Sequence, residues 1–539
     1  MTEQASHTRG DTEVELLSET IGERLDRTVA AFAEREALVD AVTGRRWTYA
    51  ELASDVDRVA RGLRARGVAK GDRVGIWAAN CPEWVLVQYA TARLGAVLVN
   101  INPAYRTHEL AYALNRSGIS LLIALADERG SERGSERGGD RREMVAEAGG
   151  SCPALRGTLW IGESAWQRLD GPDEDFPVLH CDEPINIQYT SGTTGFPKGA
   201  TLSHRNILNN GHCVGALLGY TEQDRICVPV PFYHCFGMVL GNLAALSHGA
   251  CVVIPARSFD PAATLRTVAA ERATSLYGVP TMFIAELGLP DFAGYDLSSL
   301  RTGLMGGSPC PVEVMKRVQS DLGMTEVAIA YGMTETSPVS TLTRRDDDLA
   351  HRTGTVGRVL PHIEVKVADP ADGRPLPRGT VGELCTRGYS VMLGYWDEPE
   401  RTAEAVDRDG WMHTGDLAVM HPDGYLAVVG RIKDMIIRGG ENIYPREIEE
   451  FLHTHPEVAD VQVVGVPDER YGEEVFAFVV LRDPATGPAP EELAEYCRGR
   501  LARFKAPRHV RVVDAFPMTV SGKVRKNELR ERAARELGR

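Results

Sequence analysis

The spacing of apolar residues near the start of the chain predicts helices that alternate with strands. Between residues 52 and 63, apolar side chains recur at intervals of four, three and four, which predicts an amphipathic helix. Thr48 and Glu51 have the spacing of a capping box at its start, and the pattern stops near Gly67. The next expected elements are a short buried strand, a helix and another apolar run, at 74–77, about 82–94 and 96–99. This alternation predicts a parallel sheet covered by helices.

The pattern changes twice further along the chain. From about 354 to 430 the segments are short and alternating, with period two at 363–367 and hairpin-type turns at Asp372-Gly373 and Asp423-Gly424. These features predict a small β-rich subdomain. After Arg431 a mixed α/β pattern returns. The elements expected there are a helix near 445–453, strands around 461–464 and 475–481, a helix at 490–500 and a charged helix at 526–537.

The length of the chain indicates more than one domain. At 539 residues it exceeds a single compact core, and we expect a domain boundary between residues 430 and 431. The last domain, 431–539, would have about 109 residues, which is enough to fold separately. Residues 127–142 repeat Glu-Arg-Gly-Ser almost in tandem and cannot build a core, so we expect a disordered surface insertion there.

Charge and cysteine usage exclude several classes of protein. The chain has 60 Lys and Arg against 75 Asp and Glu, a net charge of −15, which argues against a nucleic-acid or anionic-membrane binder. Ten dispersed cysteines without a C-x-x-C pair favour a reducing compartment and indicate neither a zinc site nor a disulfide framework. Residues 1–16 lack the apolar core of a signal peptide, and prolines interrupt the uncharged stretch 226–256. We therefore expect a cytoplasmic protein without a transmembrane segment, and a buried core that lines a pocket at 226–256.

Residues 190–199 form the most informative segment of the chain. Gly192, Gly195 and Gly199 let the backbone approach a ligand closely, and Lys198 supplies a positive charge. The hydroxyl donors are Thr190, Ser191, Thr193 and Thr194. This combination is typical of a loop that binds a polyphosphate. It is not a Walker A loop, because Pro197 occupies the place of the second glycine. A Gly/Thr-rich surface loop is the alternative interpretation.

Four further segments place polar groups beside glycine within apolar sequence. Their candidate residues are His234 in 231–237, Tyr331, Thr334 and Glu335 in 331–335, Asp416 in 414–416, and Lys523 in 521–523. Each segment is weak evidence alone, and an isolated His234 is more often a core or gate residue than a catalyst. Together with 190–199, in this order, they form a specific pattern.

With these segments the chain resembles the adenylate-forming, or AMP-binding, superfamily of acyl-CoA synthetases, luciferases and peptide-synthetase adenylation domains. The resemblance covers roughly residues 20–535, and the chain is most similar to medium-chain acyl-CoA synthetases, especially the branch of family member 2. The further matching segments are 102–105, 184–192, 392–396, 430–442 and 517–523.

The resemblance implies an α/β fold and a two-step reaction. The large N-terminal domain, 1–430, would hold two parallel-sheet α/β subdomains at about 20–353 and the β-rich subdomain at 354–430. The small α+β domain at 431–539 would be a mobile lid. A carboxylate would attack the α-phosphate of ATP and release pyrophosphate, and the thiol of coenzyme A would then attack the acyl-adenylate. ATP, Mg²⁺ and coenzyme A are the implied cofactors and substrates.

The resemblance also implies a nucleotide site. The phosphate contacts would come from Thr190, Ser191, Gly192, Thr193, Thr194, Gly195, Phe196, Pro197 and Lys198. Glu335 would ligate Mg²⁺, and Tyr331 would stack on adenine opposite Gly306 and Gly307, with Thr334 nearby. Asp416 would accept the ribose hydroxyls, supported by Arg431, while Lys523 would reach the α-phosphate and the acyl carboxylate. The candidate catalytic residues are Lys523, Glu335, Thr194 and His234.

For the second step, the resemblance implies rotation of the last domain about Lys433. Gly439 and Gly440 would face the pantetheine channel, and Lys505 would either meet a phosphate of coenzyme A or be a solvated surface lysine. His234 would border the acyl pocket or the thiol channel as a gate. The candidate acyl-pocket residues are Met238, Val239, Gly278, Val279, Met305 and Gly306. This apolar set favours a medium-chain fatty acid over a dicarboxylate and leaves aryl and branched acids open.

Other interpretations predict different features. A stand-alone adenylation enzyme would load a carrier protein, a luciferase-type oxygenase would share the motifs, and a non-catalytic regulator would have lost Lys198, Glu335, Asp416 or Lys523, all of which are present. We expect no fused carrier domain, because no Asp-Ser signature follows Lys523. Residues 517–523 have the Pro-x4-Gly-Lys form that protein acetyltransferases recognise in similar enzymes, which makes an acetyltransferase acting at Lys523 a candidate partner. The sequence assigns no oligomeric state.

Overall fold

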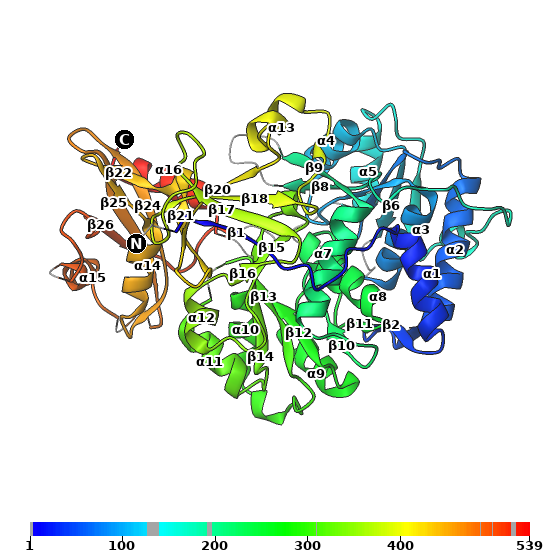
Figure 1. The fold of residues 1–539 in the computed structure, drawn as a ribbon, viewed down its shortest axis with the longest axis horizontal. Helices are drawn as coiled ribbons and strands as arrows, with labels where there is room; N and C mark the ends of the chain where they lie inside the picture. Colours follow the sequence, from blue (N-terminus) through cyan, green and yellow to red (C-terminus); the bar gives the residue numbers. More distant parts are fainter. Residues whose placement is uncertain are drawn as a thin grey trace. The chain divides into compact units, whose positions relative to one another are not determined.

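The computed structural model describes residues 4–126, 140–190, 197–308, 310–483, 485, 487–498, 500–518 and 524–538 (Figure 1). The chain forms two compact units. The larger unit consists of Thr8–Val365 and Thr386–His413, and the smaller of Met1–His7, Lys366–Cys385 and Thr414–Arg539. The domain boundary expected between residues 430 and 431 stays a prediction.

Two sheets, each with parallel central strands, form the framework of the larger unit. Within the described residues, one sheet has nine strands in the order β16-β15-β14-β13-β12-β10-β11-β2-β3, of which β14 to β2 run parallel. Its bounds are β16 Arg358–Val359, β15 Val339–Leu342, β14 Glu326–Gly332, β13 Thr302–Gly306, β12 Ser275–Gly278, β10 Arg225–Cys227, β11 Cys251–Ile254, β2 Glu36–Asp40 and β3 Arg45–Thr48. The predicted parallel α/β architecture is confirmed.

The second sheet of the larger unit has seven strands among the described residues, in the order β19-β9-β8-β5-β4-β6-β7. Strands β8 to β7 are parallel, whereas β9 and β19 are added antiparallel at one edge. The bounds are β19 Gly394–Tyr395, β9 Lys198–Ser203, β8 Pro184–Thr190, β5 Val97–Asn100, β4 Arg73–Trp77, β6 Leu121–Leu125 and β7 Thr158–Ile161.

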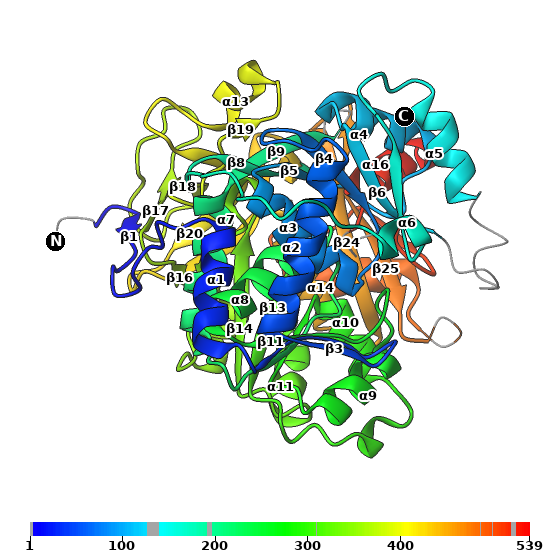
Figure 2. The same cartoon turned by 90° about the vertical axis from the view of Figure 1, so that its right-hand side faces the viewer.

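Helices pack on these sheets, and α1, α2 and α3 contact one another in one layer (Figure 2). The helices of this unit are α1 Ile21–Phe32, α2 Tyr49–Ala65, α3 Pro82–Leu94, α4 Thr107–Ser117, α5 Arg141–Gly149, α6 Ser164–Gln167, α7 His204–Leu217, η1 Phe236–Leu243, α8 Ala244–His248, α9 Pro261–Glu271, α10 Pro280–Leu287, η2 Phe292–Gly294, α11 Val312–Ser320, η3 Thr334–Thr336, α12 Leu349–Gly354 and α13 Pro399–Ala405.

The first predicted helix, α2, forms as its local sequence dictates. The Thr48 hydroxyl accepts the backbone N–H of Glu51, and the Glu51 carboxylate accepts the N–H of Thr48, so the predicted capping box is present. The apolar positions Leu52, Val56, Val59 and Leu63 are all buried. Periodicity and capping therefore placed this helix correctly.

The stretch 226–256 is a buried part of the core, as predicted, and its role in lining a pocket stays a prediction. It contains β10, the π-helix η1, α8 and β11, and most of its side chains are inaccessible to solvent. In the part of the chain that the structure describes, no helix is both long enough and apolar enough to cross a membrane. All ten cysteines are free thiols, and nine of them are buried.

The expected disordered insertion at 127–142 lies outside the described residues up to position 139. For the last three positions the prediction was wrong. Asp140 is the N-cap of α5, and its side chain accepts the N–H of Arg142 at 2.7 Å. The helix then buries Met144, Val145 and Ala148, which supply the apolar contacts that the repeat itself lacks.

Among the described residues, the smaller unit contains the C-terminal sheet and part of a second sheet whose strands continue into the larger unit. The strands β1 His7–Arg9, β17 Ile363–Ala368, β18 Gly382–Gly388, β20 Met412–Met420 and β21 Leu426–Arg431 form one five-stranded sheet, in the order β1-β17-β18-β20-β21. Four of these strands fall in or near the predicted β-rich stretch. The other sheet contains β22 Ile436–Arg438, β23 Glu441–Ile443, β24 Val458–Asp468, β25 Gly472–Leu481 and β26 His509–Val512.

The C-terminal sheet is buried on both faces, which explains its continuous apolar runs. Val461 and Val463 pack in one core cluster with residues of α14 and α15, whereas Val464 and Val466 pack in a second cluster with residues of α16. The helices are η4 Ile432–Asp434, α14 Pro445–His453, α15 Pro490–Cys497 and α16 Lys526–Glu536. The predicted helix at 490–500 was too long, because Arg498 has ψ 136° and leaves the helical conformation.

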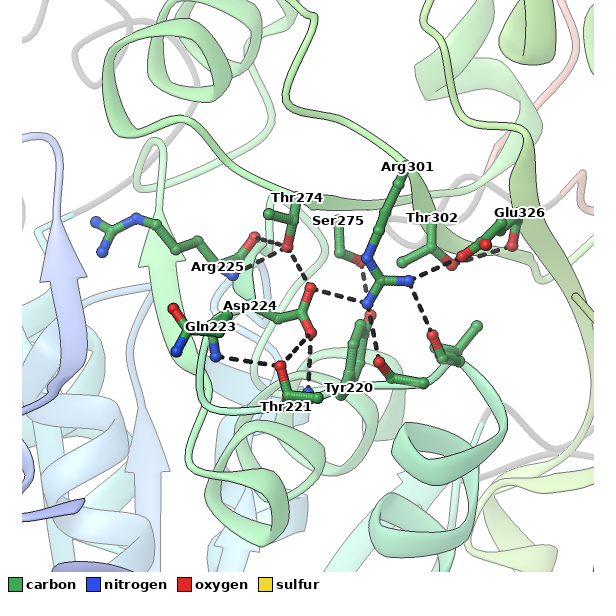
Figure 3. A network of polar contacts seen from close by, with 12 residues as sticks. Tyr220, Thr221, Gln223, Asp224, Arg225, Thr274, Ser275, Arg301, Thr302 and Glu326 are labelled. Atoms are coloured by element: carbon green, nitrogen blue, oxygen red, sulfur yellow. Dashed lines mark hydrogen bonds and ion pairs between the residues drawn. The ribbon is translucent and has the colours of Figure 1, made fainter.

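A polar network joins strands of the nine-stranded sheet at their amino ends (Figure 3). Arg301, which precedes β13, donates to Asp224 Oδ1 and to Glu326 Oε2 at 2.9 Å each. It also donates to the carbonyl oxygens of Leu218 and Gly219. Asp224 precedes β10 and is almost fully buried. Because parallel-sheet ligands bind at the opposite, carboxyl edge, we assign this network to stability.

Arg301→Ala is expected to lower the free energy of unfolding by about 3 kcal/mol, because Asp224 would keep a buried charge without its guanidinium partner. Chemical denaturation measures this loss. The matched control is Arg345→Ala, whose guanidinium contacts the same Glu326 but is 46% exposed, so a change under about 1 kcal/mol is expected. Similar losses in both variants would contradict the structural role of the Asp224 contact.

Candidate active site

Two neighbouring parallel strands bring the predicted adenine-binding residues together. Gly306 ends β13 and pairs with Ala330 of β14, so Tyr331 follows at the carboxyl edge of the adjacent strand. Gly307 has φ +88°, a conformation that favours glycine, and a Cβ there would lie 3.2 Å from Val279 Cγ1. Ligands of open α/β sheets bind at this edge. The tyrosine therefore lies next to a segment of glycine backbone that has no side chains.

Glu335 lies in η3, directly after β14. Its side chain is buried, and its Oε1 accepts a hydrogen bond of 2.8 Å from the Tyr395 hydroxyl. Burial, together with the nearby Glu335 carboxylate, raises the pKa of Tyr395, which keeps this hydroxyl protonated as a donor. The main-chain oxygen of Glu335 accepts the N–H of Met392 at 2.9 Å. A carboxylate oxygen is a ligand type that Mg²⁺ prefers, so this residue fits a magnesium site.

The two ends of the predicted phosphate loop are paired. Thr190 ends β8, Lys198 begins β9, and these residues are opposite each other in the antiparallel ladder. Ser191, Gly192, Thr193, Thr194, Gly195 and Phe196 lie outside the described residues. The Lys198 ammonium is 4.7 Å from the centroid of the Tyr395 ring. Lys198, which is predicted to bind phosphate, and Glu335, which is predicted to bind the metal ion, therefore contact the same tyrosine.

The His234 segment lies next to η3. The sulfur of Cys235 is 3.8 Å from the Thr334 hydroxyl, and His234 Nδ1 accepts the N–H of Phe236 at 3.1 Å. His234 is half-buried at the start of the π-helix η1. Of the four candidate catalytic residues, the structure thus brings His234 and Glu335 into one neighbourhood.

The candidate acyl-pocket residues lie in η1, at and just after the end of β12, and in β13. Met238 is buried, its sulfur lies 3.1 Å from Asn100 Nδ2, and its carbonyl oxygen accepts Gln88 Nε2 at 3.2 Å. A Cβ at Gly278 would approach Phe283 to 2.9 Å, so only glycine fits there without a shift. These contacts fix the positions of Met238 and Gly278.

Asp416 and Arg431 form an ion pair within the smaller unit. They are opposite each other on β20 and β21, and Arg431 Nε donates to Asp416 Oδ1 at 2.8 Å. Asp416 is buried, whereas Arg431 is half exposed. The predicted support of Asp416 by Arg431 therefore has a direct geometric basis.

The other residues predicted for coenzyme A and for the hinge also belong to the smaller unit. Lys433 is exposed in η4. Gly439 and Gly440 form the exposed two-residue turn between β22 and β23, both with positive φ. Lys505 contacts both carboxylate oxygens of Glu447 at 2.7 Å, so it is ion-paired and not a simply solvated lysine. Lys523 lies outside the described residues.

Sequence reasoning missed one residue of this site. Tyr395 belongs to 392–396, a segment that supported the family resemblance, but no role was assigned to it. Its position between Gly394 and Trp396, in this matching segment, could have marked it as a candidate. Its contacts with Glu335 and Lys198 depend on residues that are far apart in the sequence.

Comparisons with known proteins identify the family of the chain. Residues 25–396 match the AMP-binding enzyme family and residues 447–523 match the AMP-binding enzyme C-terminal domain. The chain belongs to the AMP-binding enzyme family and is an acyl-CoA synthetase of that family. This confirms the family predicted from the motifs.

Three similar proteins illustrate the match. The putative acyl-CoA synthetase YngI of Bacillus subtilis is 49% identical over 541 residues, covering 96% of this chain and 98% of the relative. The human mitochondrial medium-chain acyl-CoA ligase ACSF2 is 42% identical over 556 residues, covering 99% and 90%. The crystal structure of ATP-bound MatB from Rhodopseudomonas palustris has a TM-score of 0.86 at 32% identity, covering 96% and 99%.

Proposed function

We propose that this protein joins a medium-chain fatty acid to coenzyme A through an acyl-adenylate, with release of AMP and pyrophosphate. The proposal rests mainly on Tyr395, which contacts both Lys198 and Glu335. Glu335 lies close to the carboxyl ends of β13 and β14. Glu335 follows β14 at this edge and Lys198 reaches the same tyrosine from β9, an arrangement that suits a nucleoside triphosphate with its metal ion. We also propose a cytoplasmic location, which the free thiols support.

In the first half-reaction, a carboxylate oxygen bonds to the α-phosphorus as the bond to pyrophosphate breaks. Lys198 and the hydroxyls of 190–194 would hold the β- and γ-phosphates, while Tyr331 and Gly306 would hold adenine. Asp416 would accept the ribose hydroxyls, fixed by Arg431. A magnesium ion held by Glu335 would offset charge on the phosphates. Lys523 would stabilise the charge that develops at the α-phosphate.

In the second half-reaction, the thiol of coenzyme A attacks the acyl carbonyl carbon and AMP leaves. Lys433 would act as the hinge, and the Gly439-Gly440 turn would line the pantetheine channel. His234 would act as a gate at the acyl side. Lys505 would have to exchange Glu447 for a phosphate of coenzyme A, which makes it the weakest member of the proposed set.

The proposed substrate class is based on the apolar residues predicted for the acyl pocket and on the similarity to ACSF2. Met238, Val239 and Met305 are fully buried apolar residues, which suit an uncharged acyl chain. An apolar pocket distinguishes neighbouring chain lengths by only about 1–3 kcal/mol per methylene, so we expect a range of acids and not a single one.

The test measures the two half-reactions with a panel of acids. Purified protein is incubated with acetate, hexanoate, octanoate, decanoate, palmitate, benzoate or malonate, and ATP–pyrophosphate exchange and acyl-CoA formation are followed separately. We expect both activities to be highest with the medium-chain acids. Exchange without acyl-CoA would support the carrier-loading alternative, and no exchange with any acid would support the non-catalytic regulator.

A further inference from the structure

Tyr395 contacts the two opposite charges of the proposed nucleotide site. Its hydroxyl donates to Glu335 Oε1 at 2.8 Å, and its ring lies 4.7 Å from the Lys198 ammonium. The side chain is only 7% exposed. Glu335 lies in η3 and Lys198 in β9. One buried tyrosine therefore connects the end of the predicted phosphate loop to the carboxylate that is predicted to bind the metal ion.

The backbone around Tyr395 is fixed by three sets of contacts. Strand β19 pairs with β9, with Tyr395 opposite Ala200. The N–H of Tyr395 donates to Thr402 Oγ1 at 2.9 Å. Three residues earlier, the N–H of Met392 donates to the carbonyl oxygen of Glu335. The segment 392–395 therefore holds both the main chain and the side chain of Glu335.

We propose that Tyr395 is a positioning residue of the adenylation half-reaction. Its hydroxyl orients the Glu335 carboxylate toward the metal ion, and its ring holds the Lys198 ammonium near the phosphates. The tyrosine gives each charge a separate partner, so neither has to break an ion pair with the other before it binds ligand. Residues that orient a metal ligand affect metal affinity about 10- to 100-fold when removed. This inference rests on the proposed function of the site.

The first test uses Tyr395→Phe, which removes the hydroxyl and keeps the ring. The Mg²⁺ concentration for half-maximal ATP–pyrophosphate exchange is expected to rise about 10- to 100-fold, and saturating Mg²⁺ is expected to restore most of kcat. Mn²⁺ binding to the protein–ATP complex, measured by electron paramagnetic resonance, should weaken by a similar factor. Thioester formation from supplied acyl-adenylate should stay unchanged.

Two further variants separate the hydroxyl from the ring and from folding. Tyr395→Leu removes the ring as well and is expected to raise the KM for ATP, because Lys198 loses its partner. Thr402→Val removes the acceptor of the Tyr395 N–H and should shift Mg²⁺ dependence in the same direction, which tests the idea if Tyr395→Phe does not fold. The matched control is Tyr49→Phe, since the buried Tyr49 hydroxyl donates to the Ala250 carbonyl instead.

The outcomes distinguish this inference from the proposed function. An active wild-type protein with unchanged Mg²⁺ dependence and Mn²⁺ affinity in Tyr395→Phe would overturn the positioning role alone. A loss of activity in that variant that high Mg²⁺ does not restore would also overturn it, because the tyrosine would then be merely structural. A wild-type protein without exchange for any acid would overturn the proposed function.

Discussion

Glu335→Gln is expected to lower the rate of ATP–pyrophosphate exchange by about 10²- to 10³-fold while the protein stays folded. The glutamine amide has nearly the same size, and its oxygen can still accept the Tyr395 hydroxyl. It has no negative charge, however, and Mg²⁺ prefers carboxylate oxygens. The decrease in exchange rate therefore measures the effect of the negative charge without a large change in packing. Single-turnover formation of acyl-adenylate at several Mg²⁺ concentrations measures it.

The matched control is Glu326→Gln, the same change at the amino end of β14. Glu326 accepts Arg301 and Arg345 on the edge of the sheet away from the site, so catalysis by the folded protein should not change. An exchange rate in Glu335→Gln within a few-fold of the wild type would contradict a metal-binding role for Glu335. Equal losses in both variants would contradict it as well.

Lys523→Ala is expected to lower acyl-adenylate formation by a similar factor of about 10²–10³ and to leave thioester formation from supplied acyl-adenylate largely intact. The first half-reaction brings two anions together, so it needs a cation at the α-phosphate, whereas the second joins a thiol to an already activated acyl group. Lys523 lies outside the described residues, and this prediction follows from its place in Ser521-Gly-Lys523. The two half-reactions are measured separately.

Lys526→Ala provides the comparison, because it removes the same charge three residues further on. The Lys526 ammonium contacts Glu449 at 2.6 Å, a role in the smaller unit's own packing. Both half-reactions should persist in this variant. Equal loss of both half-reactions in Lys523→Ala would show that the lysine is not confined to adenylation.

The local elements and the family could be predicted from the sequence alone. The helix after Thr48 was predicted correctly because capping and apolar spacing act within a few residues. The order of the motifs identified the family, since those residues are close together within each segment. In the last domain, the helix expected near 445–453 matches α14, Pro445–His453, which has proline in its first turn. The helix expected at 490–500 ends earlier, at Cys497.

Only the tertiary structure decided which of these residues meet. Gly306 lies beside the Tyr331 strand because of the register of β13 and β14, and Lys505 pairs with Glu447 across 58 positions. Tyr395 reaches Glu335 across 60 positions, and Lys198 is further still in the chain. Strand register and side-chain contacts of this kind depend on the packing of distant segments, whereas the sequence pattern reports mainly on neighbours. For that reason the sequence determined the chemistry available to this protein, and the fold determined that one buried tyrosine would join its lysine to its carboxylate.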